Sequence, residues 1–222
     1  MDASNLRIKR VIVEAKYNGV LSYARLREEL FDRWVKDFAR IGVSDSSIEI
    51  IDTSRCFKVF SEWNRSGLYF ENVENPSDYI KKTSEYLGKL LAHYKRTELL
   101  RIGNRFEFIL EYKEPFEKLF TILKANIYKE KVDELGEIVD FGTLALTAKD
   151  GDHKIKISLG PMRKHEITQR NEFGFEQDPD VALFLDIDYY SDVKKEYELE
   201  EFIQKAWKFA DNRSKQFIKS IS

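Results

Sequence analysis

The sequence has few of the features that identify a compartment or a reaction. Its 222 residues include one cysteine, four prolines and ten glycines, so no disulfide can form within the chain and little of it can serve as long linkers. No apolar run approaches the roughly 18 residues of a membrane-spanning helix. The N-terminus also lacks the apolar core of a signal peptide. We therefore expect a cytoplasmic protein without a membrane partner.

Catalytic and metal-binding motifs are missing as well. The sequence contains no phosphate-binding glycine loop, dinucleotide fingerprint or nucleophile elbow. Its histidines, His93, His153 and His165, stand at no metal-ligand spacing from one another or from Cys56. Cys56 lies in an apolar stretch and is expected to be a buried, inert thiol. These observations predict no catalytic residue, no cofactor and no metal.

Charge of one sign is also absent. The 37 basic and 39 acidic residues leave a net charge of −2, so there is no overall basic signal for nucleic acid, although a local patch stays open. What the chain does contain is apolar and aromatic residues: 42% are hydrophobic, including 16 Phe and 11 Tyr. That content is enough for a large core and argues against a disordered chain.

The first half predicts a strand, a helix, three strands and a second helix. Residues 10–17 alternate around a Val-Ile-Val run, as strands do. The first helix is expected to begin after Ser22 and to end at Gly42. Its apolar stripe would be Tyr23, Leu26, Leu30, Trp34, Phe38 and Ile41. The other expected elements are strands over 47–52, 56–63 and 67–73 and a helix over 75–94.

The second half predicts nearly the same order. A long strand over 100–112 is followed by a helix that Pro115 begins. Asp150-Gly151 is a strong signal for a two-residue hairpin turn. A polar loop is expected over 170–180 and a closing helix over 199–221. The remaining expected strands are 136–149, 153–159, 163–169 and 181–190.

The shared order predicts an α+β fold of two similar units, residues 1–97 and 98–222, closely packed or forming one domain. Such units favour a mainly antiparallel, curved sheet with helices on one face. The arrangement would be like that of TATA-binding-protein-like or helix-grip folds, an analogy that carries no function. The alternative is two unrelated α+β pieces that share an order by chance.

Two strands carry the candidate site residues. Asp186 and Asp188 share one face of the strand over 183–190, about 7 Å apart. They could form salt bridges, contact a ligand or partner, or flank a divalent cation. Arg101 and Arg105 likewise share a face, with Gly103 between them. Beside the two aspartates they would form an ion-pair network that holds strand register, or an anion-binding concavity.

Phe173 and Phe175 are further candidates because they lie in the polar loop. Aromatic side chains in such a loop can close the edge of a core, anchor a protein partner or stack on bases. The sequence leaves these three roles open.

Two short stretches resemble a known family. Arg101-Ile102-Gly103-Asn104-Arg105-Phe106 follows a long helix, and Leu185-Asp186-Ile187-Asp188 precedes the last one. The pairing resembles a sporadically distributed prokaryotic family that carries an Arg-Ile-Gly-x-Arg-Tyr-like strand and a late Leu-Asp-Ile-Asp strand. Phe106 departs from the usual tyrosine. The resemblance implies no catalytic residue, because the family has no assigned activity.

The sequence thus favours a partner-binding module without catalytic activity, most simply a homo-oligomer. The alternative is a protein that binds or processes a phosphorylated or acidic small molecule through Arg101, Arg105, Asp186 and Asp188. Nucleic-acid binding on the sheet face is the third hypothesis, and the net charge of −2 disfavours it. Because all four residues belong to the second half, the first half is expected to act as scaffold.

Overall fold

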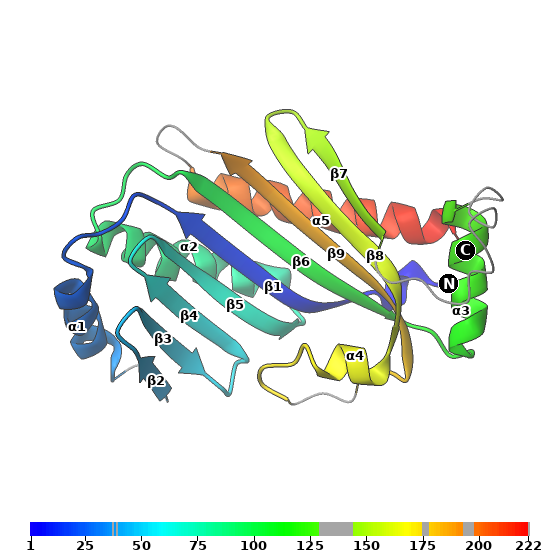
Figure 1. Ribbon diagram of the computed structural model, residues 1–222, viewed down its shortest axis with the longest axis horizontal. Helices are drawn as coiled ribbons and strands as arrows, with labels where there is room; N and C mark the ends of the chain where they lie inside the picture. Colours follow the sequence, from blue (N-terminus) through cyan, green and yellow to red (C-terminus); the bar gives the residue numbers. More distant parts are fainter. Residues whose placement is uncertain (37, 39, 129–143, 175–177, 193–197, 222) are drawn as a thin grey trace.

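The computed structural model describes residues 1–36, 38, 40–128, 144–174, 178–192 and 198–221. Within them the chain forms one open, curved sheet of nine antiparallel strands in the order β2-β3-β4-β5-β1-β6-β9-β8-β7 (Figure 1). The α+β class and the antiparallel sheet are therefore confirmed. No helix in these ranges is long and apolar enough to span a membrane.

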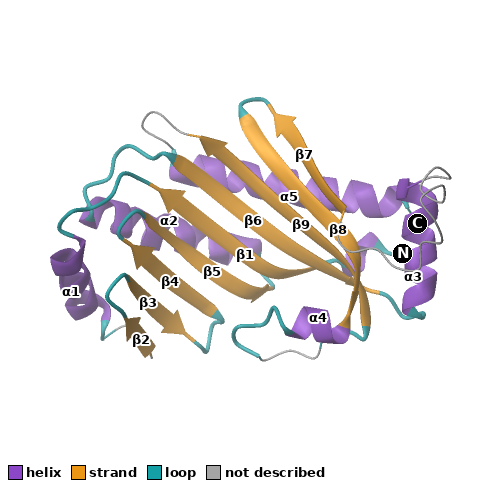
Figure 2. Cartoon of the chain, viewed as in Figure 1, coloured by secondary structure: helices purple, strands orange, loops and turns teal. Residues whose placement is uncertain are grey.

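Residues 1–97 contribute the left part of the sheet in Figure 2 and two helices. A short 3₁₀ turn over Ala3–Asn5 precedes them. The strands are β1 (Arg7–Lys16), β2 (Arg40–Val43), β3 (Ser47–Asp52), β4 (Phe57–Glu62) and β5 (Arg65–Val73). The helices are α1 (Tyr23–Trp34) and α2 (Pro76–His93).

The remaining residues contribute four strands and three helices to the described structure. The strands are β6 (Arg101–Glu111), β7 (Leu144–Asp150), β8 (His153–Arg163) and β9 (Val181–Asp192). The helices are α3 (Phe116–Leu123), which continues as a π-helical turn over Lys124–Tyr128, α4 (Lys164–Thr168) and α5 (Leu199–Ser220).

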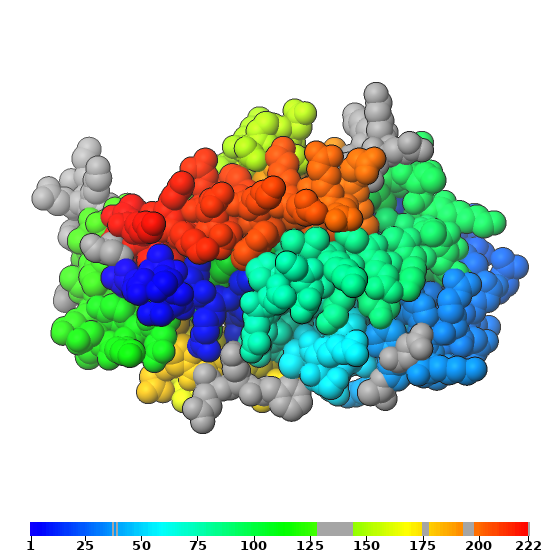
Figure 3. Space-filling model, turned by 180° about the vertical axis from the view of Figure 1, so that it is seen from behind, coloured from blue at the N-terminus to red at the C-terminus, as the bar shows by residue number. Residues whose placement is uncertain are grey.

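The core lies between the sheet and the two long helices. Seen from behind, α2 and α5 lie side by side across this face (Figure 3). The strands turn alternate side chains toward them, and Val11, Phe57 and Phe106 are fully buried there. Burying each such side chain stabilises the fold by about 1.5–3 kcal/mol. The opposite face of the sheet, called the open face below, carries the other set of alternating side chains.

The sheet runs without a break across the predicted boundary between the units. β1 and β6 pair antiparallel at its centre, with Val11 opposite Phe106 and Ile12 opposite Arg105. The division at residues 97 and 98 stays a prediction.

The first helix is shorter than expected. α1 ends at Trp34, and Arg40–Val43 forms the edge strand β2 beside β3. Phe38 still reaches the core, where its ring meets those of Trp34, Phe57 and Tyr86. The helical stripe was wrong beyond Trp34 because an apolar side chain can reach the same core from a turn after the helix.

Residues 163–169 do not form the expected strand. They contain α4, which begins where the backbone N–H of Arg163 donates to the Glu166 carboxylate at 2.7 Å. Ile167 packs with Ile109 and Phe184 on the open side of the sheet. Helices therefore lie on both faces, which corrects the expectation of one. The expected strand over 136–149 begins at Leu144 in the described residues, and 136–143 lie outside them.

Candidate binding surface on the open face

The four predicted polar residues come together on the open face. Arg105 donates to both carboxylate oxygens of Asp186, at 2.9 Å from Nε and 2.6 Å from Nη2. Arg101 donates to Asp188 at 3.1 Å. β6 and β9 are neighbouring strands, with Arg105 opposite Asp188 and Gly103 opposite Tyr190. Arg105 thus reaches the aspartate on the diagonal, whereas Arg101, opposite Asp192, reaches along the strand to Asp188, and the pairs form one network across two strands.

Arg101 is held on two sides. Its guanidinium lies 4.0 Å from the centroid of the Tyr190 ring, a cation–π contact, while it donates to Asp188. Burial raises the pKa of Asp188 above its ordinary value, and the positive charge of Arg101 opposes that rise. Asp188 therefore ionises less readily than an exposed aspartate, although its side chain borders open space.

The centre of the network is Glu107, which sequence reasoning did not single out. Its side chain is 1% exposed, yet it lies opposite Asp186, another acid, across β6 and β9. Three guanidinium groups surround it: Arg10 in a close ion pair, and Arg105 and Arg170 each at 3.3 Å. A buried carboxylate needs such partners because its desolvation is costly. Alternation along the strand over 100–112 did place Glu107 on this face.

A strap, defined as residues 164–174, crosses the open face from β8 to β5. Arg170 lies over the Phe184 ring at 4.5 Å on its way. At the far end Glu71 of β5 accepts hydrogen bonds from the backbone N–H groups of Glu172 and Phe173, the latter at 2.8 Å. The strap thereby brings Glu172 to a residue 101 positions earlier in the sequence.

The strap also places one of the two predicted phenylalanines. Phe173 is half-buried, with its ring 6.0 Å from that of Tyr69 on β5. The contact corresponds to the first of the three predicted roles, closure of an edge of the protein. Phe175 lies outside the described residues.

A buried ion pair holds the end of the loop that follows the strap. Lys9 of β1 and Asp178 are 2.8 Å apart, and their side chains are 3% and 1% exposed. Thr168 and Asn171 also donate to Asp178, at 3.0 and 2.7 Å. Burial alone would raise the pKa of Asp178, but the hydrogen bonds from Lys9, Asn171 and Thr168 lower it. Asp178 is therefore expected to be a carboxylate across the neutral range.

Beyond the strap the open face contains a hollow of about 410 Å³, a volume in the range of ligand sites. Gly103 lines it, and the missing side chain leaves the backbone of β6 uncovered. Nine of the thirteen lining residues belong to the first half, so that half is more than scaffold. The lining residues are Ile12, Glu14, Ser47, Glu49, Lys58, Phe60, Glu62, Arg65, Tyr69, Arg101, Gly103, Arg105 and Asp188.

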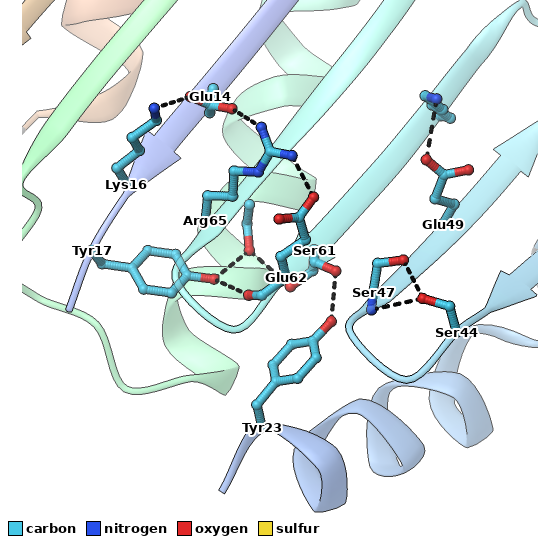
Figure 4. A network of polar contacts seen from close by, with 12 residues as sticks. Glu14, Lys16, Tyr17, Tyr23, Ser44, Ser47, Glu49, Ser61, Glu62 and Arg65 are labelled. Carbon is cyan, nitrogen blue, oxygen red and sulfur yellow. Dashed lines mark hydrogen bonds and ion pairs between the residues drawn. The ribbon is translucent and has the colours of Figure 1, made fainter. Parts of the chain in front are cut away.

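The rim of the hollow on the first-half side is a chain of ion pairs. Figure 4 shows Arg65 between Glu14, at 3.1 Å, and Glu62. The same view shows Tyr17 pointing to the backbone carbonyl of Glu62, at 3.3 Å, from the core side of the sheet. The β4–β5 turn is thus tied on both faces, which fixes the position of the Arg65 guanidinium.

Within the described part of the chain, no third carboxylate is available for a cation beside Asp186 and Asp188, because Glu107, opposite Asp186, is already surrounded by three guanidinium groups. Asp192 pairs with Lys154 at 2.6 Å, and Asp180 pairs with Lys164 at 3.3 Å. Among the described residues no three His, Cys, Asp or Glu side chains are grouped to hold a metal. Cys56 is half-buried at the start of β4, so the expectation of a fully buried thiol was wrong.

The geometry therefore describes a polar, ligand-sized hollow on a sheet face, without assigning it to a known class of protein. No protein-family model matches this chain, and no curated protein matches it significantly. The resemblance carried by Arg101–Phe106 and Leu185–Asp188 stays a prediction.

Proposed function

We propose that the open face binds a protein partner, and that the hollow receives charged side chains of that partner. The observation that carries the proposal is the balance of charge around the hollow: four cations and four carboxylates line it, the cations being Lys58, Arg65, Arg101 and Arg105. Ion pairs already hold these groups in place, so a segment that carries both signs finds donors and acceptors in fixed positions.

The same balance argues against the other two hypotheses. An anionic small molecule would need guanidinium groups without carboxylate partners. Arg105, however, forms a bidentate ion pair with Asp186, and Arg101 is paired with Asp188. Nucleic acid would need a field of one sign, because phosphate contacts dominate its affinity. A protein segment with acidic and basic side chains fits a surface of mixed sign.

The proposal includes the predicted homo-oligomer and the doubled architecture. β1 and β6 begin the two predicted units and pair at the centre of the sheet. This placement supports, as an interpretation, the analogy to TATA-binding-protein-like saddles, in which two units form one binding surface. A second copy of this chain is one partner that carries both signs. The cytoplasm stays the predicted compartment.

Filling the hollow tests the proposal. A Cβ added at Gly103 would meet its nearest neighbours, Tyr190 and Asp188, at 3.4 and 3.5 Å, so Gly103→Val should fold normally while its methyl groups occupy the hollow. The matched control is Gly88→Ala in α2, on the helix face, where an added Cβ meets nothing within 4 Å. The variants are compared with wild type for self-association by light scattering and for proteins that crosslink to the open face in lysate.

The expected result is a partner whose crosslinks map to β1, β4 and β6 and whose binding is lost in Gly103→Val and kept in Gly88→Ala. The binding should also weaken as salt rises. Partners that crosslink only to α2 and α5, or that bind Gly103→Val as well as wild type, would contradict the proposal. A monomer in light scattering would exclude the second copy as the partner and leave other proteins to be tested.

A further inference from the structure

A second candidate site lies on the other face of the molecule and is independent of the proposed function. α5 packs against β6 and β9, and the β7–β8 hairpin projects beyond it (Figure 1). From behind, this hairpin remains visible above α5 (Figure 3). Its strands nevertheless turn apolar side chains to the helix side, including Leu146 opposite Ile157 and Leu144 opposite Leu159.

The result is an apolar groove between the hairpin and α5. It has a volume of about 490 Å³ and is lined largely by aliphatic and aromatic side chains. Leu146 in its wall is 49% exposed, and Ala148 is also exposed. Contiguous apolar surface of this kind on a folded protein usually marks a site of interaction. The apolar lining residues are Ile127, Leu144, Leu146, Ala148, Ile157, Leu159, Leu185, Ile187, Phe209 and Phe217.

One end of the groove is positively charged. A second hollow of about 360 Å³ adjoins it and shares Phe209, Arg213 and Gln216. Lys205 and Lys208 line that hollow, and both are exposed on α5. Within the described ranges no carboxylate forms a salt bridge with Lys205, Lys208 or Arg213.

The single acid in the second hollow does not neutralise this charge. Asp150 already accepts a hydrogen bond from the Tyr189 hydroxyl at 3.0 Å. Three cations and one engaged carboxylate leave a net positive end, in contrast to the balanced lining of the open face. Lys149 adds a further cation to the rim of the apolar groove.

We propose that this groove binds a single-chain amphiphile with an anionic head group, of the class of long-chain carboxylates. The tail would lie against the apolar walls, and the head would reach Arg213, Lys205 and Lys208. Arg213 is placed for both parts, since its guanidinium lies 5.5 Å from the Phe209 ring centroid. Apolar contact supplies affinity and the cationic end selects the head group.

The test uses amphiphiles with the same twelve-carbon tail, each below its micelle concentration: dodecanoate, dodecyl maltoside and dodecyltrimethylammonium. Binding is measured by titration calorimetry. Dodecanoate is expected to bind at one site and at least tenfold more tightly than dodecyltrimethylammonium. Decanoate, two methylenes shorter, should bind roughly fifteenfold more weakly than dodecanoate, at about 0.8 kcal/mol for each methylene.

Two variants of β7 test whether the ligand binds in the groove. Ala148→Phe fills the groove and should abolish dodecanoate binding. Thr147→Phe adds the same ring to the same strand on the opposite face, opposite Lys156, and should leave binding unchanged. Both positions are exposed, so both variants should fold. If Ala148→Phe does not fold, Leu146→Asn is used in its place. Arg213→Gln should weaken dodecanoate severalfold and leave dodecyl maltoside unaffected.

Several results would overturn the proposal. These are no saturable binding of any probe, equal binding of the three head groups, or equal loss of binding in Ala148→Phe and Thr147→Phe. A dimer of the wild type that Ala148→Phe dissociates, without dodecanoate binding, would instead identify a second copy of this chain as the occupant.

Discussion

Lys9 and Asp178 form a buried ion pair that also contacts the strap, through Thr168 and Asn171. Both side chains are almost fully buried, so the two opposite charges attract each other strongly. The same burial removes their hydration, which costs free energy. Such a pair adds little stability over an apolar pair of the same shape. Loss of the Asp178 charge, however, takes a carboxylate away from a buried ammonium group, which is costly. The contacts of Asp178 with Thr168 and Asn171 of the strap therefore depend on both residues.

The first prediction compares the removal of one partner of this ion pair with the replacement of both. Asp178→Asn keeps the shape and the contacts with Thr168 and Asn171 but removes the counter-charge of Lys9. It should lower the free energy of unfolding by about 3–5 kcal/mol. Lys9→Met added to Asp178→Asn should restore most of the loss. Urea denaturation of the single and double variants measures both effects.

The matched control is Asp180→Asn, whose partner Lys164 is exposed and whose own side chain is 90% exposed. This change should cost less than about 1 kcal/mol. Equal losses in Asp178→Asn and Asp180→Asn would show that burial adds nothing to the Lys9–Asp178 pair.

The second prediction is the pH dependence of the same pair. The folded state lowers the pKa of Asp178 below its ordinary 3.8, so the unfolded chain binds the proton first as the solution is acidified. The stability that the pair contributes is complete above pH 3.8 and is lost as the pH falls through the lowered value. Wild type should therefore lose its stability advantage over a chain without this carboxylate below pH 3.8.

Urea midpoints of wild type and Asp178→Asn between pH 2.5 and 6 measure this dependence. The difference between the two curves should shrink below pH 3.8. Burial raises the pKa of Asp188, so this residue lowers the stability of the folded state as the pH rises above 3.8. Asp188 is present in both proteins, and its effect therefore cancels in the difference. A difference that stays constant with pH would refute the assignment to Asp178.

At the same scale, the four predicted ion-pair residues could be placed from the sequence because alternation along one strand is a local property. Arg101 and Arg105 share a face for the same reason that Asp186 and Asp188 do. That β6 and β9 are neighbours could not be derived from the sequence, because β6 pairs with the last strand of the chain and not with β7, the next one. The contacts of Glu107 with Arg10 and Arg170 join residues 97 and 63 positions apart, and no local pattern records such pairs.

At the scale of elements, two glycines have opposite requirements. Gly67 in β5 lies beneath the Phe60 ring, and an added Cβ would come within 2.2 Å of the Val13 carbonyl oxygen and 2.5 Å of the ring. Gly88 lies in the middle of α2, where an added Cβ meets no atom within 4 Å. The first glycine is needed for a close approach, whereas the second only weakens a helix.

The third prediction follows from that difference. Gly88→Ala should raise the free energy of unfolding by about 0.5–1 kcal/mol, the difference in helix propensity. Gly67→Ala should lower it by about 1–3 kcal/mol, because backbone atoms must move to admit the methyl group. Thermal and urea unfolding of the two variants provide the measurement. Destabilisation by Gly88→Ala would mean that α2 packs more closely there than the structure shows.

The elements that the sequence did not predict correctly have a common cause. α1 and β2 were merged because Phe38 and Ile41 continue the helical spacing, and the period cannot tell a helix from a turn that leads to the same core. α4 is five residues long, too short for its period to be distinguished from that of a strand. The longer elements, β6, β9, α2 and α5, have enough turns or alternations to be identified.

At the scale of the whole molecule, the strap links two distant strands of the sheet, β8 and β5. Its helix packs on β8, and its last residues hydrogen-bond to Glu71 on β5, with β9, β6 and β1 between these two strands. This contact links residues of the two predicted units on the open face, in addition to the β1–β6 pairing. Glu172 of the strap also pairs with Lys58, which lines the hollow. The proposed partner surface therefore depends on where the strap lies.

The fourth prediction tests that dependence. Glu71 is 3% exposed and accepts backbone N–H groups of Glu172 and Phe173. Glu71→Gln replaces these charge-assisted hydrogen bonds by weaker ones and turns an amide toward the same donors. A loss of about 1.5–3 kcal/mol in local stability should make tryptic cleavage after Arg170 at least tenfold faster. Amide exchange at Glu172 and Phe173 should accelerate by a similar factor.

Glu14→Gln is the control, because Glu14 lies on the same face and pairs with Lys16 and Arg65 without contacting the strap. Its cleavage rate after Arg170 should equal that of wild type. Both variants should keep the melting temperature of the core, since the lost contacts are local. Faster cleavage accompanied by an equal fall in global stability would instead mean that Glu71 supports the whole sheet. Equal cleavage of all three proteins would mean that the other contacts hold the strap without Glu71, among them Phe173 with Tyr69 and Arg170 with Glu107.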